Sequence, residues 1–288
     1  MAKFGLYLPL FIFTPNLFGA GAGGVSLSAE KAFMIGSLPV TNSMITSWII
    51  SLAIIFIIRI LVGKATLVPS KGQLFVESIV GGMRGIVEPI VGNRAFFASF
   101  WLLSGLFIFI LINNWSGLLP GVGTLGDGYY DENGHFVMVN SLIRPGNADL
   151  NMTLALASVA NICWLYFIFK FEGLKNIVIH IFGNKADKKE VGLVVFFGLF
   201  PLFLAVGVIE IVSILFRPVS LTFRLFGNVF GGESLLHSMF YLVPELAWIL
   251  PLPFYFMEVL IGLVQALVFM LLIAVYIGLM CNHGEEHH

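Results

Sequence analysis

The second half of the chain carries a few ionisable side chains inside long apolar runs. They are Glu210, Arg217, Arg224, Glu233, His237, Glu245 and Glu258. Carboxylates and histidine can bind and release protons, whereas the guanidinium of an arginine stays protonated at any ordinary pH. Groups of this kind could pass protons beside a fixed positive charge, or they could form structural ion pairs and hydrogen bonds between packed helices.

The spacing of these residues sorts them onto helix faces. Steps of seven, seven and four residues place one set along a single face of a helix: Glu210, Arg217, Arg224 and Asn228. Glu233 follows Arg224 by nine residues, which is about 900° of helical turn and therefore the opposite side. His237 comes one turn after Glu233, so that these two side chains can meet.

The last apolar run adds two polar side chains, Glu258 and Gln265, which share a helix face because they are seven residues apart. If the last two helices form an antiparallel hairpin, Gln265 can lie near Arg224 and Glu258 near Glu233. We therefore predict a fixed cation with acidic groups in two separate regions, Glu210 on one side and the pair of Glu233 and Glu258 on the other.

The composition places these residues in a membrane protein. Of the 288 residues, 58% are hydrophobic and 11% are charged, whereas about one quarter of the residues of a soluble domain are charged. Several apolar runs reach roughly 20 residues, which is enough to cross the hydrocarbon core as a helix. With a net charge of −1, nucleic acid is not an expected partner. Cys163 and Cys281 lack metal-ligand spacing, and we expect no metal site and no cofactor.

The predicted fold is an all-α membrane protein, a polytopic bundle of about five membrane-embedded helices. Residues 71–92 combine apolar positions at helical spacing with charged positions opposite, which predicts an interfacial amphipathic helix. Ordinary spans are expected at residues 45–62, 95–115, 150–169 and 253–280.

The apolar stretch at 191–242 allows two interpretations, because Pro201 and Pro218 interrupt it. It could form two ordinary spans. Alternatively, residues 202–242 could form one helix of roughly 60 Å, about twice the hydrocarbon thickness. Such a helix would have to lie tilted in the membrane, with a kink at Pro218.

Turn and charge signals predict what lies outside the membrane core. The dipeptide Asn133-Gly134 between aromatic and β-branched arms predicts a small external β-hairpin. Residues 1–24 have the pattern of a signal peptide, or alternatively of an interfacial segment, and residues 25–288 are expected to form one membrane-embedded domain. Lysine and arginine concentrate after the first and third spans, so the positive-inside rule places those segments in the cytoplasm and the N-terminus outside.

Four segments resemble one known family. The stretch "RPVSLTFRLFGNVFGGE" (residues 217–233) closely resembles the signature of subunit a of F-type ATP synthases. The segments "LINNWSGLLPG", "RPGNADLNMTLALA" and "VQALVFMLLIAVYIGLM" resemble other helices of that family. The resemblance favours one bent helix over two spans, because the last two helices of the family form a long tilted hairpin. Since the chain has no phosphate-binding loop of the G-x-x-x-x-G-K-[ST] form, ATP chemistry is expected on partner subunits.

The resemblance also implies roles for the polar residues. Arg224 would be the essential arginine that faces the rotating ring of c subunits, attracts an ionised ring carboxylate and blocks a direct leak between two offset half-channels. Protons would reach the ring through an inlet half-channel from outside and leave through an exit half-channel to the cytoplasm. The implied inlet residues are Glu233, Glu258, His237 and Asn114, the implied exit residue is Glu210, and the polar residues flanking the arginine are Asn228 and Gln265.

The chain departs from some family members on the inlet side. Those members carry an aspartate close to the position of Asn114, where this chain has no acid, and a histidine at the position of Glu258. The implied partners are the c-subunit ring, the b subunits of the peripheral stalk, the remaining ATP synthase subunits and the lipid bilayer. The implied location is the plasma or inner membrane of a bacterium, with the C-terminus in the cytoplasm.

Two other functions stay open on the residues alone. A secondary transporter could use Arg224 to bind an anionic substrate, although the chain shows no internal repeat of the kind that such proteins often have. A non-conducting assembly subunit could use its buried charges only for structure.

Overall fold

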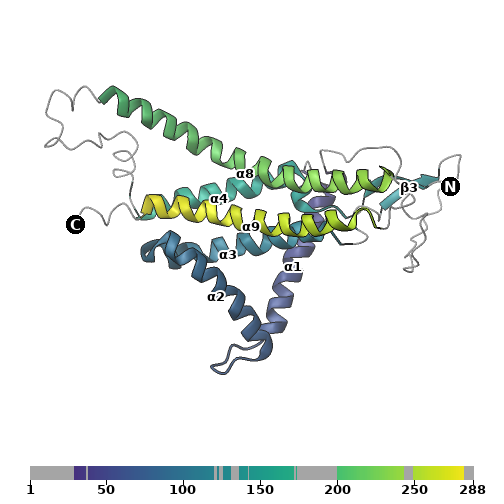
Figure 1. The fold of residues 1–288 in the computed structure, drawn as a ribbon, viewed down its shortest axis with the longest axis horizontal. Coiled ribbons are helices and arrows are strands. Elements are labelled where there is room, and N and C mark those ends of the chain that lie inside the picture. The colour runs from purple at the N-terminus through teal and green to yellow at the C-terminus, as the bar shows by residue number, and fades with distance from the viewer. Residues whose placement is uncertain are drawn as a thin grey trace.

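The computed structural model describes residues 29–36, 38–119, 122, 126–130, 136–141, 143–171, 173, 200–242 and 249–281. Within these ranges, five helices are long and apolar enough to cross a membrane. They are α1 (Asn42–Val62), α3 (Asn93–Ser116), α4 (Leu150–Phe171), α8 (Phe200–Leu242) and α9 (Leu252–Cys281). The predicted polytopic helical bundle is therefore confirmed (Figure 1). The predicted signal peptide at 1–24 lies outside the described residues.

α1 begins at Asn42, earlier than predicted, because a polar turn precedes its apolar part. The hydroxyl of Thr41 accepts a hydrogen bond from the amide of Met44 and caps the helix. The first two turns bury four polar side chains, Asn42, Ser43, Thr46 and Ser47. Apolar periodicity does not detect such a turn, since its buried residues are polar.

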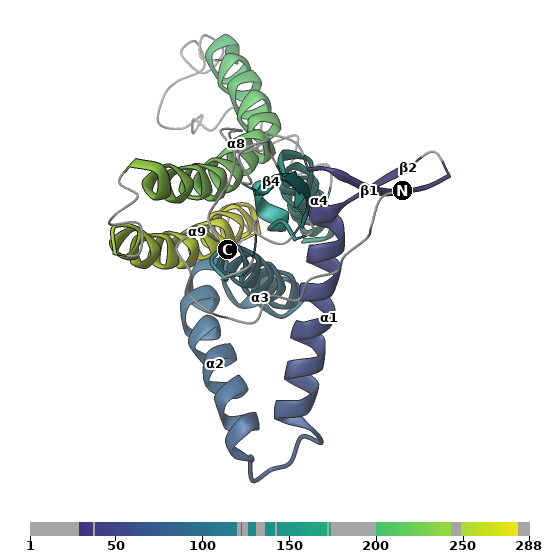
Figure 2. The same cartoon turned by 90° about the vertical axis from the view of Figure 1, so that its right-hand side faces the viewer.

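The predicted amphipathic helix is confirmed as α2 (Lys71–Val91). Ser70 caps it by accepting a hydrogen bond from the amide of Gln73. Its later turns bury Met83, Val87 and Val91 against the bundle. α1 and α2 form a helical hairpin whose tip projects away from the other helices (Figures 1 and 2). The interfacial position of α2 stays a prediction.

The long apolar stretch forms one helix, so the two-span interpretation is wrong for the part of it that the structure describes. α8 has 43 residues, which at about 1.5 Å each make roughly 65 Å. Pro218 lies inside it and has no N–H for the carbonyl four residues earlier, and the helix changes direction near its middle (Figure 2). α9 runs back along α8 in the opposite direction, as predicted for the hairpin (Figure 1).

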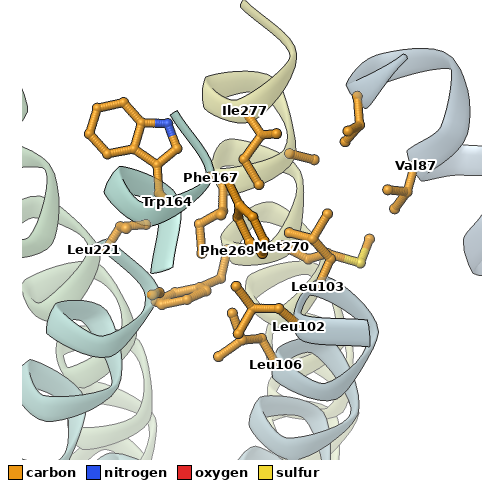
Figure 3. Close-up of a cluster of buried hydrophobic side chains, with 14 of the residues drawn as sticks. Val87, Leu102, Leu103, Leu106, Trp164, Phe167, Leu221, Phe269, Met270 and Ile277 are labelled. Atoms are coloured by element: carbon orange, nitrogen blue, oxygen red, sulfur yellow. The ribbon is translucent and has the colours of Figure 1, made fainter. Parts of the chain in front are cut away.

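The apolar core lies between α2, α3, α4, α8 and α9, and α9 contacts the other four helices. Phe269 and Met270 of α9 are buried among side chains such as Leu103 of α3 and Phe167 of α4 (Figure 3). Close approach of α9 to α2 requires a glycine at Gly278, because a Cβ there would overlap a backbone carbonyl of α2. This core holds α4 and α9 together, and α8 packs against both of them.

α4 follows a short 3₁₀ turn, η2 (Gly146–Ala148), and is capped by Asp149. Oδ1 of Asp149 accepts a hydrogen bond from the amide of Asn151 over 3.1 Å. η2 contacts α1, α3, α4 and α8, so this turn gathers the ends of four helices.

Two antiparallel hairpins accompany the helices in the described ranges. β3 (Gly126–Tyr130) pairs with β4 (Phe136–Ser141), which confirms the predicted hairpin, although its turn at 131–135 lies outside the description. β1 (Lys31–Ile35) pairs with β2 (Leu38–Thr41) directly before α1, and we did not predict this pairing. Gly36 follows β1 with a φ of 63°, so a turn glycine between two short apolar arms was the available signal.

Candidate functional site

Arg224 lies in the second half of α8, on a helix that the rest of the described chain covers poorly. Its side chain is exposed, whereas the adjacent Leu225 and Phe226 are buried. The buried residues of α8 gather beside it, on the other faces of the helix, whereas among residues 201–220 only Gly207 is buried. Among the residues that the structure describes, Arg224 has no hydrogen bond, ion pair or ring contact. Arg224 therefore forms no structural ion pair with Glu210.

Asn228 and Gln265 join α8 to α9 one turn beyond Arg224. Nδ2 of Asn228 donates a hydrogen bond to Oε1 of Gln265 over 2.7 Å. This contact places Gln265 beside the arginine's part of α8, as the predicted hairpin requires. Gln265 is buried, and its Nε2 has no hydrogen-bond partner in the described part of the protein. A buried donor in this position is suited to a water molecule or a passing polar group.

Further along the hairpin, Glu258 lies beside the turn of α8 that carries Glu233. The carboxyl group of Glu258 lies directly against the backbone of Gly232, where a Cβ would overlap it. Glu258 is buried, and Oε2 of Glu233 is buried without a hydrogen-bond partner in the described ranges. His237 occupies the expected place on α8, but its side chain lies outside what the structure describes.

Asn114, at the end of α3, connects the same region of α9 to η2. Its Nδ2 donates to the carbonyl of Gly262 over 3.0 Å, and its Oδ1 accepts from Nδ2 of Asn147 over 2.7 Å. Gly262 lies between Glu258 and Gln265 in the sequence of α9. The structure therefore brings Asn114 into one polar region with both of these predicted residues.

A buried polar cluster continues from Asn114 to the start of α1, and our sequence analysis assigned it no role. Oγ of Ser43 donates to Oδ2 of Asp149 over 2.9 Å. Oδ1 of Asn113 and Oδ1 of Asn147 are buried without a hydrogen-bond partner among the described residues. These polar residues are visible in the sequence, but their spacing does not indicate that α1, α3 and η2 meet.

Arg144 is a further residue that the sequence did not identify as part of the site. It is buried, and its Nη2 donates to the carbonyl of Ala148 over 3.1 Å. It lies close enough to Glu233 for their opposite charges to attract. Nothing in the local sequence indicates that the segment of Arg144 folds back to α8.

Glu210 lies at the other end of the described site, in the first half of α8. Its charge attracts the guanidinium of Arg217, which is half-buried beside Trp164 of α4 and Tyr276 of α9. The structure thus separates Glu210 from the pair of Glu233 and Glu258, in agreement with the two predicted regions.

Apolar side chains lie between these two regions. From Gln265 to Tyr276, the buried residues of α9 are all apolar, namely Ala266, Phe269, Met270, Ile273 and Ala274. Leu221 and Leu225 of α8 pack into the same core. Thr222 is buried beside Leu221, but its hydroxyl donates to the carbonyl of Pro218 on its own helix. A charge or a proton cannot readily cross a layer so poor in polar groups. Arg224 lies on α8 beside the layer and faces away from it.

Comparison with known proteins agrees with this arrangement. A family model described as ATP synthase A chain matches residues 44–278. ATP synthase subunit a of Mycobacterium ulcerans (strain Agy99) is 32% identical over 242 residues, which cover 83% of this chain and 85% of that protein. The corresponding protein of Moorella thermoacetica is 30% identical over 250 residues, or 86% and 94% of the two chains. That of Gloeobacter violaceus is 29% identical over 266 residues, or 92% and 94%. Because the family model and these relatives cover most of its length, the chain belongs to the ATP synthase A chain family.

Proposed function

We propose that the chain is the proton-conducting stator subunit of an F-type ATP synthase, with two offset half-channels that lead to and from a ring of c subunits. The family and the five candidate spans support a multi-pass membrane subunit of that complex. Bacterial relatives support a bacterial membrane as its location. Its other proposed partners are the b subunits of the peripheral stalk, the subunits that bind ATP, and lipid.

The exposure of Arg224 is the observation that carries this proposal. A permanent charge within an apolar helix is costly unless a partner or water meets it. The side chain of Arg224 is exposed and has no partner in the described part of its own chain. A carboxylate on a second protein would satisfy this charge. The ring of c subunits, with one carboxylate on each subunit, has the required chemistry.

The inlet half-channel is proposed to pass from the polar cluster at α1 and η2 through Asn114 to Glu258 and Glu233. Several buried polar atoms along this line lack hydrogen-bond partners in the described ranges. Buried polar groups are normally satisfied, so these atoms are places where water can bind. Water between carboxyl groups would let a proton move from one to the next.

Asn228 and Gln265 are proposed to mark the inner end of the inlet, where the proton passes to a ring carboxylate. Protonation removes the charge of that carboxylate and lets it leave Arg224 for the lipid. After rotation, the proton leaves on the side of Glu210. Since the apolar layer separates the two regions, a proton reaches Glu210 only by travelling on the ring. His237, one turn from Glu233, is proposed as a further inlet residue.

The orientation follows from the basic segments after the first and third spans, which are proposed to be cytoplasmic. With α8 as one helix, the described residues hold five candidate spans, an odd number. The N-terminus and the hairpin of β3 and β4 then lie outside, and the C-terminus lies in the cytoplasm.

ATP-driven proton pumping into inverted vesicles that contain the assembled complex tests this function. Arg224→Ala is expected to reduce pumping by roughly 100-fold, because it removes the charge that the ring carboxylate meets. Arg59→Ala is a matched control, since Arg59 is an exposed arginine near the end of α1. Normal pumping by an assembled Arg224→Ala complex would contradict the proposal.

A further inference from the structure

Arg217 has surroundings that its own chain supplies. Its guanidinium carbon lies 4.0 Å from the centroid of the Tyr276 ring and 4.7 Å from the centroid of the Trp164 ring. The two rings contact each other edge-on, with their centroids 6.4 Å apart. A cation over an aromatic face is attracted by the ring. Three helices, α4, α8 and α9, therefore hold one guanidinium, and we call this group the aromatic clamp.

The aromatic clamp lies beside an acid and contains spare donors. The charge of Glu210, seven residues earlier on α8, attracts Arg217. Nη1 of Arg217 and Nε1 of Trp164 are buried without a hydrogen-bond partner in the described part of the chain. Trp164 is 2% exposed and belongs to the apolar core (Figure 3). Two buried donors of this kind can bind an acceptor such as water.

Helix packing alone does not account for a cation at this position. A leucine or methionine would fill the junction of α4, α8 and α9 without the cost of placing a charge there. Arginine is also a poor proton carrier, because its guanidinium does not release its proton. What Arg217 offers, beyond volume, is a permanent positive charge at a fixed place near Glu210.

We propose that Arg217 is a positioning residue of the exit half-channel, held by the rings of Trp164 and Tyr276, whose fixed charge holds the carboxylate of Glu210 where it accepts the departing proton. This inference rests on the proposed function, because it takes Glu210 as the exit residue. The carboxylate accepts the proton that the ring carboxyl group releases, and then gives it up to water on the cytoplasmic side. Arg217 keeps its own protons throughout.

A double-mutant cycle in the assembled complex tests whether Arg217 acts through Glu210. Arg217→Gln is expected to slow ATP-driven pumping by roughly tenfold, as coupled charged neighbours do, and Arg217→Lys should retain most of the rate because it keeps the charge. In a Glu210→Gln background, Arg217→Gln should cause no further loss. A further tenfold loss in that background would overturn the proposal, since Arg217 would then act independently of Glu210.

The aromatic clamp has its own matched pairs of variants. Trp164→Phe and Tyr276→Phe keep a ring under the guanidinium, whereas Trp164→Leu and Tyr276→Leu remove it. Each leucine variant is expected to pump several-fold more slowly than its phenylalanine counterpart at equal amounts of assembled complex. Equal rates for both members of each pair would show that the rings do not hold Arg217. These variants decide the question even if Arg217→Gln fails to assemble.

The single variant Glu210→Gln separates failure of this inference from failure of the proposed exit path. If Glu210→Gln pumps normally, Glu210 is not an exit residue and the proposed function is wrong at that point. If Glu210→Gln pumps slowly while Arg217→Gln pumps normally, only the role of Arg217 is wrong.

Discussion

Arg217 and Arg224 lie seven residues apart on α8, which places them on nearly the same helix face, yet their surroundings differ completely. Arg217 is half-buried, lies over two aromatic rings and is attracted by Glu210. Arg224 is exposed and has no partner among the described residues. The chain encloses one of two similar charges between its own helices and leaves the other exposed.

The difference follows from where α4 and α9 cover α8. Trp164 and Tyr276 reach the helix just before Pro218, and the helix changes direction near its middle (Figure 2). Beyond the bend, the contacts of α8 with α9 are made by side chains such as Asn228, and Arg224 stays uncovered. Equivalent positions in a heptad spacing therefore differ in their surroundings, since neighbouring helices decide which charge is enclosed.

The largest effects are expected when Arg217 and Arg224 are each replaced by glutamine and both pumping and thermal stability are measured. Arg224→Gln is expected to lose nearly all pumping while changing the free energy of unfolding by less than about 0.5 kcal/mol, as for an uncontacted surface residue. Arg217→Gln is expected to lose less pumping but to lower stability by about 1–2 kcal/mol through loss of its ring contacts. Thermal unfolding of the solubilised complex gives the stability. The reverse order of stabilities would break the comparison.

A second test concerns the end of α8 that carries Glu233. An intermediate effect on stability and pumping is expected there. Gly232→Ala would place a Cβ where the carboxyl group of Glu258 lies. Displacing that group is expected to cost about 1–3 kcal/mol of stability and to slow pumping. Gly231→Ala is the matched control, because a Cβ there would meet nothing within 4 Å. Equal stability and pumping in both alanine variants would show that Glu258 does not need its place against Gly232.

The smallest effect is expected at a third arginine, Arg84, whose pair with Glu88 lies on α2 outside the candidate spans. Nε of Arg84 lies 2.9 Å from Oε2 of Glu88. This hydrogen bond lowers the pKa of Glu88 below its ordinary value. A lowered pKa means that the pair stabilises the fold above the ordinary pKa of a glutamate and loses this contribution as the pH falls through the folded-state value.

Thermal unfolding of the wild type and of Glu88→Gln, compared from neutral to acidic pH, measures this contribution. The wild type should be slightly more stable at neutral pH, and the difference should vanish in acid. Because the pair is exposed, the difference should also shrink at high salt. A difference in stability that is independent of pH would show that the charges of Arg84 and Glu88 do not contribute to it.

Several features could be predicted from particular residues. Apolar runs fixed the four ordinary spans, because a bilayer requires a helix of about 20 apolar residues and tolerates few alternatives. The seven-residue steps on α8 and α9 placed Glu258 beside the turn that carries Glu233, since two antiparallel helices share one repeat. The segment "RLFGN" indicated the family, which the matching family model confirms.

Other features required the tertiary structure. Charge could not distinguish one long helix at 200–242 from two spans, because the tail after α9 has no lysine or arginine. The pairing of Ser43 with Asp149 joins residues 106 positions apart, and no local pattern encodes such a contact. The attraction between Arg144 and Glu233 likewise depends on how η2 packs against α8.

The sequence by itself determined that this chain is a polytopic helical membrane protein and which of its polar residues lie within apolar helices, because composition, hydrophobic period and residue type are local properties. Only the tertiary structure decided that Arg217 is enclosed by Trp164 and Tyr276 while Arg224 is left exposed. The physical reason is that the cost of a charge in an apolar helix depends on what surrounds it, and those surroundings come from helices distant in the sequence.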